Sequence, residues 1–216
     1  MPDLHSEIEA VTVVLIGHFN PRIFQPAWLA NHGLIRPEEA EQAENLVSTA
    51  ELTTFSAKWL TVQVTSDRFQ AVANDSGHFE ALRDLVLGTF SLLEHTPFSK
   101  MGLNREFHIK MPSKERYVDL GHLLVPKERW KSFLDDPVTQ SVTVSGLLTR
   151  GELRPALNVK VEPSKRVELG IFISTNEHYE IGEKDPPQKL MEILREQWGN
   201  AMIAANKIAE NLTQLT

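Results

Sequence analysis

The stretch Leu60-Thr-Val-Gln-Val64, followed by Ser66-Asp-Arg68, decides the fold, because Leu157-Asn-Val-Lys-Val161 and Ser164-Lys-Arg166 repeat its pattern later in the chain. In both copies apolar residues alternate with polar ones, which is the period-two pattern of a β-strand with one dry face and one wet face. Each copy continues into a second extended stretch and then into a long amphipathic segment. One supersecondary unit is therefore expected to occur twice.

The amphipathic segments are expected to be helices over residues 76–95 and 187–212. In the second segment Leu190, Leu194 and Trp198 recur every four residues, which places them on one stripe of a helix. At about 1.5 Å per residue this helix would be roughly 40 Å long, enough to cross a whole sheet.

The first strand of each half has a similar composition. Val11-Thr-Val-Val-Leu-Ile16 is short and rich in β-branched residues, as buried strands are, and Val142-Thr-Val144 opens the second half in the same way. We predict an α+β fold in a single domain over residues 1–216. Its twisted antiparallel sheet would be built from two related strand-strand-strand-helix halves, about residues 8–136 and 137–216, with two long helices packed on one face.

The end of the first half is expected to contain one more strand and two short helical turns. Met101 to Met111 is expected to be a strand, although apolar and polar residues alternate imperfectly along it. Its mainly apolar set is Leu103, Arg105, Phe107 and Ile109 on one face, and its polar set is Asn104, Glu106, His108 and Lys110 on the other. Ser113 to Val125 and Lys127 to Leu134 are the expected helical turns.

Composition and charge limit the class of function. The chain has 216 residues, of which 41% are hydrophobic and 24% are charged, so a globular protein with a substantial core is expected. The formal net charge of -7 and the pI near 5.6 give no general attraction to nucleic acid or anionic lipid.

There is no cysteine, which excludes disulfides and thiolate zinc sites. The longest apolar run, residues 10–17, is too short to span a bilayer, and acidic residues precede it. We expect a cytoplasmic protein with no membrane or nucleic-acid partner.

The most function-like motif is Gly17-His-Phe-Asn-Pro21, directly after the first strand. It resembles the start of the nucleotidyltransferase signature, Gly-x-Phe-(Asp/Asn)-Pro-x-His-x-Gly-His, in which the histidines and a helix N-terminus hold a triphosphate. Here Arg22-Ile-Phe-Gln-Pro26 follows, so both histidines are missing and Pro26 interrupts the helix that should bind the anion. The β-rich remainder also lacks the alternating strand and helix order of such enzymes.

The same loop supplies candidate binding residues. His18, Asn20 and Arg22 would form a polar site at the end of the sheet, since loops on a rigid scaffold commonly carry binding groups. Phe24 and Trp28 would complete it. The competing interpretation, which we favour, is that Asn20 only makes a turn and that the aromatic residues hold a long insertion on the core.

Glu177 and His178 are candidates at the end of a later strand. Alternation places Glu177 and Tyr179 on one face of that strand and His178 on the other. A general base needs a histidine oriented by a carboxylate beside a pocket, so an ordinary solvated strand end is the favoured interpretation. The eight histidines also lack the spacing of common zinc sites. We predict no metal and no cofactor, and the sequence identifies no catalytic residue.

The stretch from Arg105 to Lys131 is the most basic and aromatic part of the chain, with Tyr117 and Trp130 among its cations. Such a mixture is typical of surfaces that touch nucleic acid or an acidic partner. Interspersed carboxylates such as Glu106 dilute the positive charge, so a mixed-sign solvated surface is the preferred interpretation.

Three further stretches resemble a family of conserved hypothetical bacterial proteins without assigned activity: Leu15 to Pro26, Phe79 to Phe90 and Leu93 to Pro97. The resemblance covers nearly the whole chain. It implies a bacterial, cytoplasmic origin and no particular chemistry.

Three functions stay open. The first is a non-catalytic binding or accessory protein that holds a protein partner, or a second copy, through its sheet face or the loop from Gly17 to Trp28. The second is an enzyme whose small polar pocket uses histidine and carboxylate acid-base chemistry. The third is a fold that grips a small apolar molecule between the sheet and the last helix. An exposed apolar patch would favour the first, a polar cavity with a perturbed histidine the second, and a large apolar cavity the third.

Overall fold

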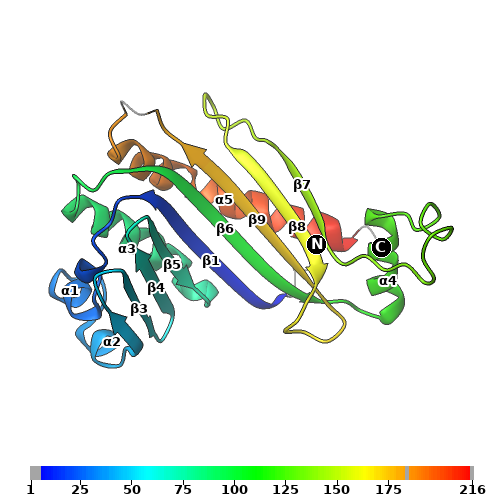
Figure 1. Cartoon of the computed structure of the whole chain (residues 1–216), viewed down its shortest axis with the longest axis horizontal. Helices are drawn as coiled ribbons and strands as arrows, with labels where there is room; N and C mark the ends of the chain where they lie inside the picture. The colour runs from blue at the N-terminus through cyan, green and yellow to red at the C-terminus, as the bar shows by residue number, and fades with distance from the viewer. Residues whose placement is uncertain (1–5, 183–184, 215–216) are drawn as a thin grey trace.

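Nine strands form one antiparallel sheet in the computed structural model, which describes residues 6–182 and 185–214 (Figure 1). The strand order is β2-β3-β4-β5-β1-β6-β9-β8-β7, and each neighbouring pair is antiparallel. The strands are β1 Ser6–Gly17, β2 Glu44–Ser48, β3 Leu52–Ala57, β4 Leu60–Thr65, β5 Arg68–Ala73, β6 Phe98–Lys110, β7 Val142–Leu147, β8 Ala156–Pro163 and β9 Gly170–Glu180. The predicted α+β fold with an antiparallel sheet is confirmed.

Helices lie on one face and at the two ends of this sheet (Figure 1). They are α1 Pro26–Asn31, α2 Pro37–Glu41, α3 Phe79–Leu92, α4 Lys114–Leu124 and α5 Gln188–Gln214, with short 3-10 turns η1 Pro21–Ile23 and η2 Ser76–His78. α3 packs on β1 and β5, and α5 packs on β6 and β9. In the part of the chain that the structure describes, no helix has both the length and the apolar composition needed to cross a bilayer.

Only one of the two predicted long helices is long. α5 has 27 residues, whereas α3 has 14 and is about 21 Å in length. The predicted helix over 76–95 is shortened at both ends. Asp75 accepts a hydrogen bond from the backbone of Gly77 and caps η2, and the α-helix ends at Leu92 before Thr96-Pro97.

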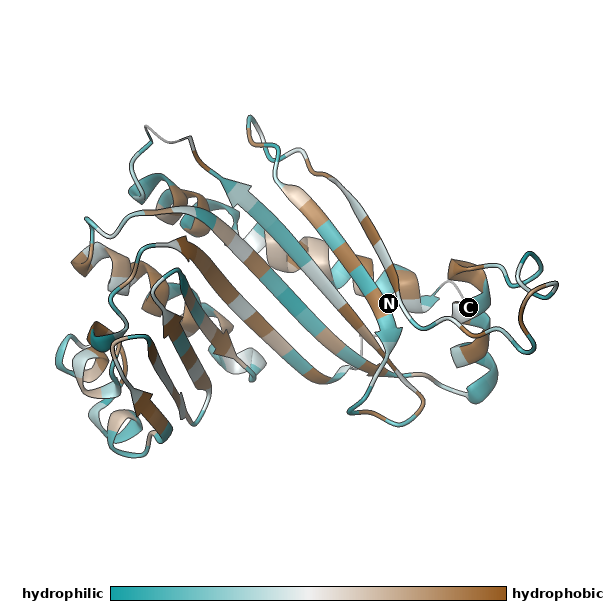
Figure 2. Ribbon diagram, in the orientation of Figure 1, coloured by the Kyte–Doolittle hydropathy of each residue, from teal (hydrophilic) through white to brown (hydrophobic). Residues whose placement is uncertain are grey.

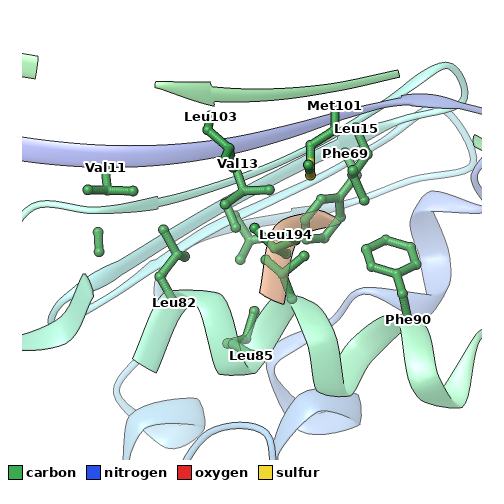
Figure 3. Packing of buried hydrophobic residues seen from close by; sticks show 14 of the residues in the cluster. Val11, Val13, Leu15, Phe69, Leu82, Leu85, Phe90, Met101, Leu103 and Leu194 are labelled. Atoms are coloured by element: carbon green, nitrogen blue, oxygen red, sulfur yellow. The ribbon is translucent and has the colours of Figure 1, made fainter. Parts of the chain in front are cut away.

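The core lies between the sheet and the helices, as alternation predicts (Figure 2). Val11, Val13 and Leu15 on β1 are fully buried and face Leu82 and Leu85 of α3 (Figure 3). A second cluster of buried residues lies nearer α4. Its members include Phe107, Ile109, Leu120, Ile171, Ile173 and Ala205. The two faces of β6 follow the predicted alternation at most positions, because Leu103, Arg105, Phe107 and Ile109 are buried, Asn104 and Glu106 are half-buried and Lys110 is exposed. His108 is the exception, since it is buried although it belongs to the polar set.

β1 and β6 form the centre of the sheet, and their junction requires glycine at position 17. A Cβ atom built on Gly17 would lie 2.2 Å from the carbonyl oxygen of Pro97 and 2.5 Å from the Cα of Phe98. His18 donates its backbone N–H to the same Pro97 oxygen at 2.8 Å. The approach of the two backbones is therefore too close for any side chain.

The sheet contains two hairpins that are each followed by a core helix: β4 and β5 before α3, and β8 and β9 before α5. β7 resembles β1 in sequence, but the two strands occupy different places, because β7 lies at an edge of the sheet and β1 at its centre. Common ancestry of the two halves stays a prediction. The predicted helical turns at Lys127 to Leu134 form hydrogen-bonded turns rather than a helix.

Candidate functional site

The loop from Gly17 to Trp28 divides into a buried aromatic part and an exposed polar part. Phe24 is 1% exposed, and its ring centroid lies 5.4 Å from that of Phe69. His18, Asn20 and Arg22 are exposed, and the side chain of Asn20 accepts the backbone N–H of Arg22 at 3.3 Å. Trp28 is half-buried against Phe24. The polar residues therefore lie on the surface, Asn20 caps η1, and the aromatic residues pack the insertion on the core.

Glu177 and His178 lie on opposite sides of the sheet. Glu177 is 3% exposed on the helix side, where it accepts hydrogen bonds from Arg150 and from the hydroxyl of Tyr179, the latter at 2.7 Å. Burial, and the negative charge of Glu177 beside it, raise the pKa of Tyr179. His178 is half-buried on the other side and lies 4.0 Å from Glu180. The two candidates therefore cannot act on one substrate.

An amide row crosses the open face, by which we mean the side of the sheet away from α3 and α5. Thr12, Asn104, Asn176, Asn158 and Ser145 stand in register on the five neighbouring strands β1, β6, β9, β8 and β7. Asn104 Nδ2 donates to the Thr12 carbonyl oxygen at 3.3 Å, and Asn176 Nδ2 donates to Asn104 Oδ1 at 2.6 Å. Asn158 Nδ2 lies 3.5 Å from Asn176 Oδ1, and Ser145 Oγ donates to Asn158 Oδ1 at 2.6 Å.

A polar hollow of about 290 Å³ opens on the same face above Gly102, where a Cβ atom would lie 3.0 Å from Asn176 Nδ2. Three basic side chains line it, Arg68 of β5, Lys100 of β6 and His178 of β9. Lys100 pairs with Glu180 at 3.0 Å, and Arg68 Nη2 donates to Gln70 at 2.7 Å. Lys100 and Arg68, the two permanent cations of the hollow, therefore already have partners.

Glu106 is the carboxylate of this hollow, and it is half-buried. Desolvation raises its pKa, and the positive charge of Arg166 partly opposes the shift. His178 pairs across the sheet with Gly102, four residues from Glu106 along β6, so the two groups lie about 14 Å apart along the strands. They do not form an acid-base pair.

The basic and aromatic stretch does not form one solvated surface. Arg105 is 4% exposed on the core side, where its guanidinium lies 4.5 Å from the ring centroid of Phe79 and pairs with Glu9 at 2.8 Å. Lys127 is also 4% exposed. Two cations of the stretch are therefore unavailable to a nucleic acid, because they belong to the packed structure.

Residues 128–138 form a loop that is closed at its base, and we call it the α4 loop. Lys127 Nζ donates to the carbonyl oxygens of Gly121 at 3.0 Å and Val125 at 2.6 Å, and it also contacts Thr139 Oγ1. Thr139 Oγ1 donates to the Gly121 oxygen at 2.8 Å. A cation at the C-terminus of a helix is stabilised by the helix dipole. The two ends of the loop are thus tied to the end of α4, as in compact surface loops that often carry function.

Exposed apolar side chains are frequent in α4, in this loop and in the following strand β7. Of the fourteen large apolar side chains that are exposed in the described residues, eight lie between residues 118 and 147. They are Val118, Leu123, Trp130, Phe133, Leu134, Val138, Val144 and Leu147. Phe133 is 81% exposed and Val138 is 72% exposed. An apolar hollow of about 320 Å³ lies beside them, between α4, residues 137–140 and the end of β8.

Sequence reasoning missed both the amide row and the α4 loop. Each asparagine occupies an ordinary wet-face position in its own strand, so only the register of the sheet brings them together. The apolar residues of the α4 loop follow no helical or strand period, so the sequence pattern does not predict whether they are buried or exposed. The one available signal was the density of Trp130, Phe133 and Leu134 in a short polar segment.

Comparisons with known proteins gave no assignment. No model of a protein family matches the chain, and no curated protein matches it. Within residues 6–182 and 185–214, no three histidine, aspartate or glutamate side chains gather as a metal site would require.

Proposed function

We propose that this protein is a non-catalytic binding or accessory protein that holds a protein partner on its α4 loop. One observation carries the proposal: Phe133 presents most of its surface to solvent, next to the exposed side chains of Trp130, Leu134 and Val138. Apolar patches of this kind mark protein interaction sites, and large aromatic side chains contribute much of the affinity at such sites.

The base of the α4 loop supports this proposal. Lys127 and Thr139 both bind the Gly121 carbonyl oxygen, which fixes the two ends of the loop on α4. α4 itself packs through buried Leu120 on the second core cluster. A binding loop on a rigid base loses less conformational entropy when a partner binds, which favours affinity.

The experiment is affinity capture from an extract of the native host with the full-length protein as bait. Three baits are compared: the wild type, Phe133→Ser and Ile203→Ser. Ile203 is 56% exposed on α5, so Ile203→Ser removes a similar apolar surface away from the α4 loop. A partner should bind the wild type and Ile203→Ser alike, and its recovery on Phe133→Ser should fall about ten-fold or more.

Equal capture on all three baits would contradict the proposal, as would the retention of a metabolite in place of a protein. Exposed substitutions of this kind alter stability by only about 0.5 kcal/mol, so unfolding does not explain the expected loss. Circular dichroism of the three baits checks this.

The alternative function is an enzyme that uses the polar hollow. It is favoured by the raised pKa of Glu106, because a desolvated carboxyl group in a polar pocket is a common general acid or base. The third hypothesis, binding of a small apolar molecule, is favoured by the apolar hollow beside α4. In both cases a small molecule would be recovered with the protein. Glu106→Gln would reduce the recovery of a substrate of the polar hollow, and it would not change the recovery of an apolar molecule bound beside α4.

We propose a bacterial, cytoplasmic protein, in keeping with the resemblance to conserved hypothetical bacterial proteins. We also propose that the two halves are related, because a hairpin followed by a core helix occurs in each of them. The acidic net charge supports the expectation that nucleic acid is not its partner.

A further inference from the structure

The two edges of the sheet differ in their protection against pairing with another strand. β2 begins with Glu44, contains Asn45 in the left-handed conformation with φ 55°, and changes register between Glu44 and Val47. Charges and irregularities of this kind are how natural proteins protect an edge. β7 has none of them. It is uncharged, contains no proline, and pairs with β8 in unbroken register from Val142 to Leu147.

The free backbone groups of β7 can be assigned from its ladder. Leu148 donates its N–H to the Pro155 carbonyl oxygen at 2.9 Å, so residue 148 faces β8. Residues of an antiparallel pair alternate between facing the neighbour and facing away. Thr143, Ser145 and Leu147 therefore direct their N–H and C=O groups away from β8. β7 is the last strand of the sheet, so these groups have no strand partner within the described chain (Figure 1).

We propose that β7 pairs antiparallel with β7 of a second copy of this chain, about a two-fold axis at Ser145. In this register the outward residues face one another: Ser145 lies opposite Ser145 of the second copy, and Thr143 lies opposite its Leu147. Each of these pairs exchanges two backbone hydrogen bonds. The interface is isologous, as in most soluble dimers, and the inference does not depend on the partner of the α4 loop.

The amide row is the first reason to choose a second copy over another strand. The row runs from Thr12 to Ser145 and ends at the residue on the axis, where Ser145 Oγ donates to Asn158 Oδ1. The same row in the second copy would begin at its own Ser145. Pairing therefore joins the two rows into one line of polar groups across both sheets, with the side chains of both copies on one face.

The side chains of β7 are the second reason. Self-pairing brings like residues close together and is unfavourable when they are charged, and β7 carries no charge. Val144, which is 63% exposed, would lie opposite Gly146 of the second copy. A Cβ atom built on Gly146 meets no atom within 4 Å, so there is free space at this position for the valine.

The test measures the mass of the full-length protein by sedimentation equilibrium at concentrations up to about 100 µM, at which a dimer with a micromolar dissociation constant is formed. The wild type should reach twice its monomer mass of 24.4 kDa. Ser145→Pro should remain monomeric, because proline removes one outward N–H without removing a bond to β8. Ser48→Pro is the matched control on β2, since Ser48 likewise points its N–H outward and bonds only Thr53 through its side chain. It should dimerise like the wild type.

A charge-swap experiment tests the axis itself and does not rely on proline. Ser145→Glu and Ser145→Lys should each be monomeric, because the axis places two like charges directly opposite each other. Mixing the two variants should restore a particle of twice the monomer mass, since the charges are then opposite. A monomeric wild type would overturn the proposal, as would dimerisation of Ser145→Pro or of either charged variant alone. A mixture that stays monomeric would also overturn it.

Discussion

Replacing Glu177 with glutamine should destabilise the protein while leaving its open face intact. The Glu177 side chain is 4% exposed and accepts charge-assisted hydrogen bonds from Arg150 and Tyr179 on the helix side of β9. Glutamine has nearly the same shape, and its amide oxygen can still accept from Arg150 while its N–H group donates to the Tyr179 hydroxyl, which must then act as the acceptor. Both hydrogen bonds therefore lose their charge assistance, and the buried Tyr179 proton loses its acceptor.

The size of the effect follows from these two bonds. A hydrogen bond to a charged group contributes about 1.5–3 kcal/mol and a neutral one about 1 kcal/mol. Arg150 comes from the turn between β7 and β8 and its side chain is 17% exposed, so it can move into water and recover part of the loss. We expect a net cost of about 2–3 kcal/mol in the free energy of unfolding. For a chain of this size that is roughly 5–10 °C in Tm.

The assay is urea unfolding followed by tryptophan fluorescence, with a thermal scan as a second measurement. Glu180→Gln is the matched control, because Glu180 is three residues further along β9, is exposed and pairs with Lys100 at the surface. Its cost should stay below about 0.5 kcal/mol. A Glu177→Gln variant that is no less stable than Glu180→Gln would refute the structural role argued for Glu177.

Two other predictions concern stability. Gly17→Ala should lower the free energy of unfolding by about 2–3 kcal/mol in chemical denaturation, because its methyl group would collide with the backbone at Pro97. Gly199→Ala is the control, because a Cβ atom at this position of α5 meets no atom within 4 Å, and it should be neutral or stabilising by about 1 kcal/mol. Equal effects of the two substitutions would contradict the close approach at Gly17. Burial raises the pKa of Glu106 above 4.5 in the folded protein, so the folded state binds the proton more tightly and stability falls as pH rises from about 4.5 through the raised pKa. Glu106→Gln should therefore gain stability over the wild type between mildly acidic and neutral pH in paired thermal scans, and a difference that does not change with pH would disprove the desolvation of Glu106.

Much of the fold could be predicted because alternation is a local property. The strand predicted at residues 101–111 has its two faces as the pattern indicates except at buried His108, and the helix predicted over 187–212 is α5. The length of α3 could not be read in this way, because its ends depend on the cap at Asp75 and on competition with the following turn. Arg105 shares a face with Leu103 and Phe107, as the pattern indicates, but its burial there depends on Glu9, which lies far away in the sequence.

The candidate sites were less predictable, because each of them depends on groups that are distant in the sequence. Glu177 and His178 lie on opposite sides of the sheet, as alternation along the strand predicts, but Glu177 is buried against Arg150 and Tyr179 and does not lie in a solvated strand end. In the loop from Gly17 to Trp28, Phe24 packs in the core and Trp28 is half-buried against it. Phe133 is exposed in a loop whose two ends are held by Lys127 and Thr139, which lie twelve residues apart in the sequence.

By itself the sequence determined which residues share a face along strands such as β4 and β9, and that the longest helix has one apolar stripe, because these properties follow from the geometry of neighbouring residues. Only the tertiary structure decided the order of strands. That order places Asn104, Asn158 and Asn176 in one row and leaves β7 at an unprotected edge. The physical reason is that strand register is a long-range pairing, fixed by how the whole sheet buries its apolar face and not by the residues of any single strand.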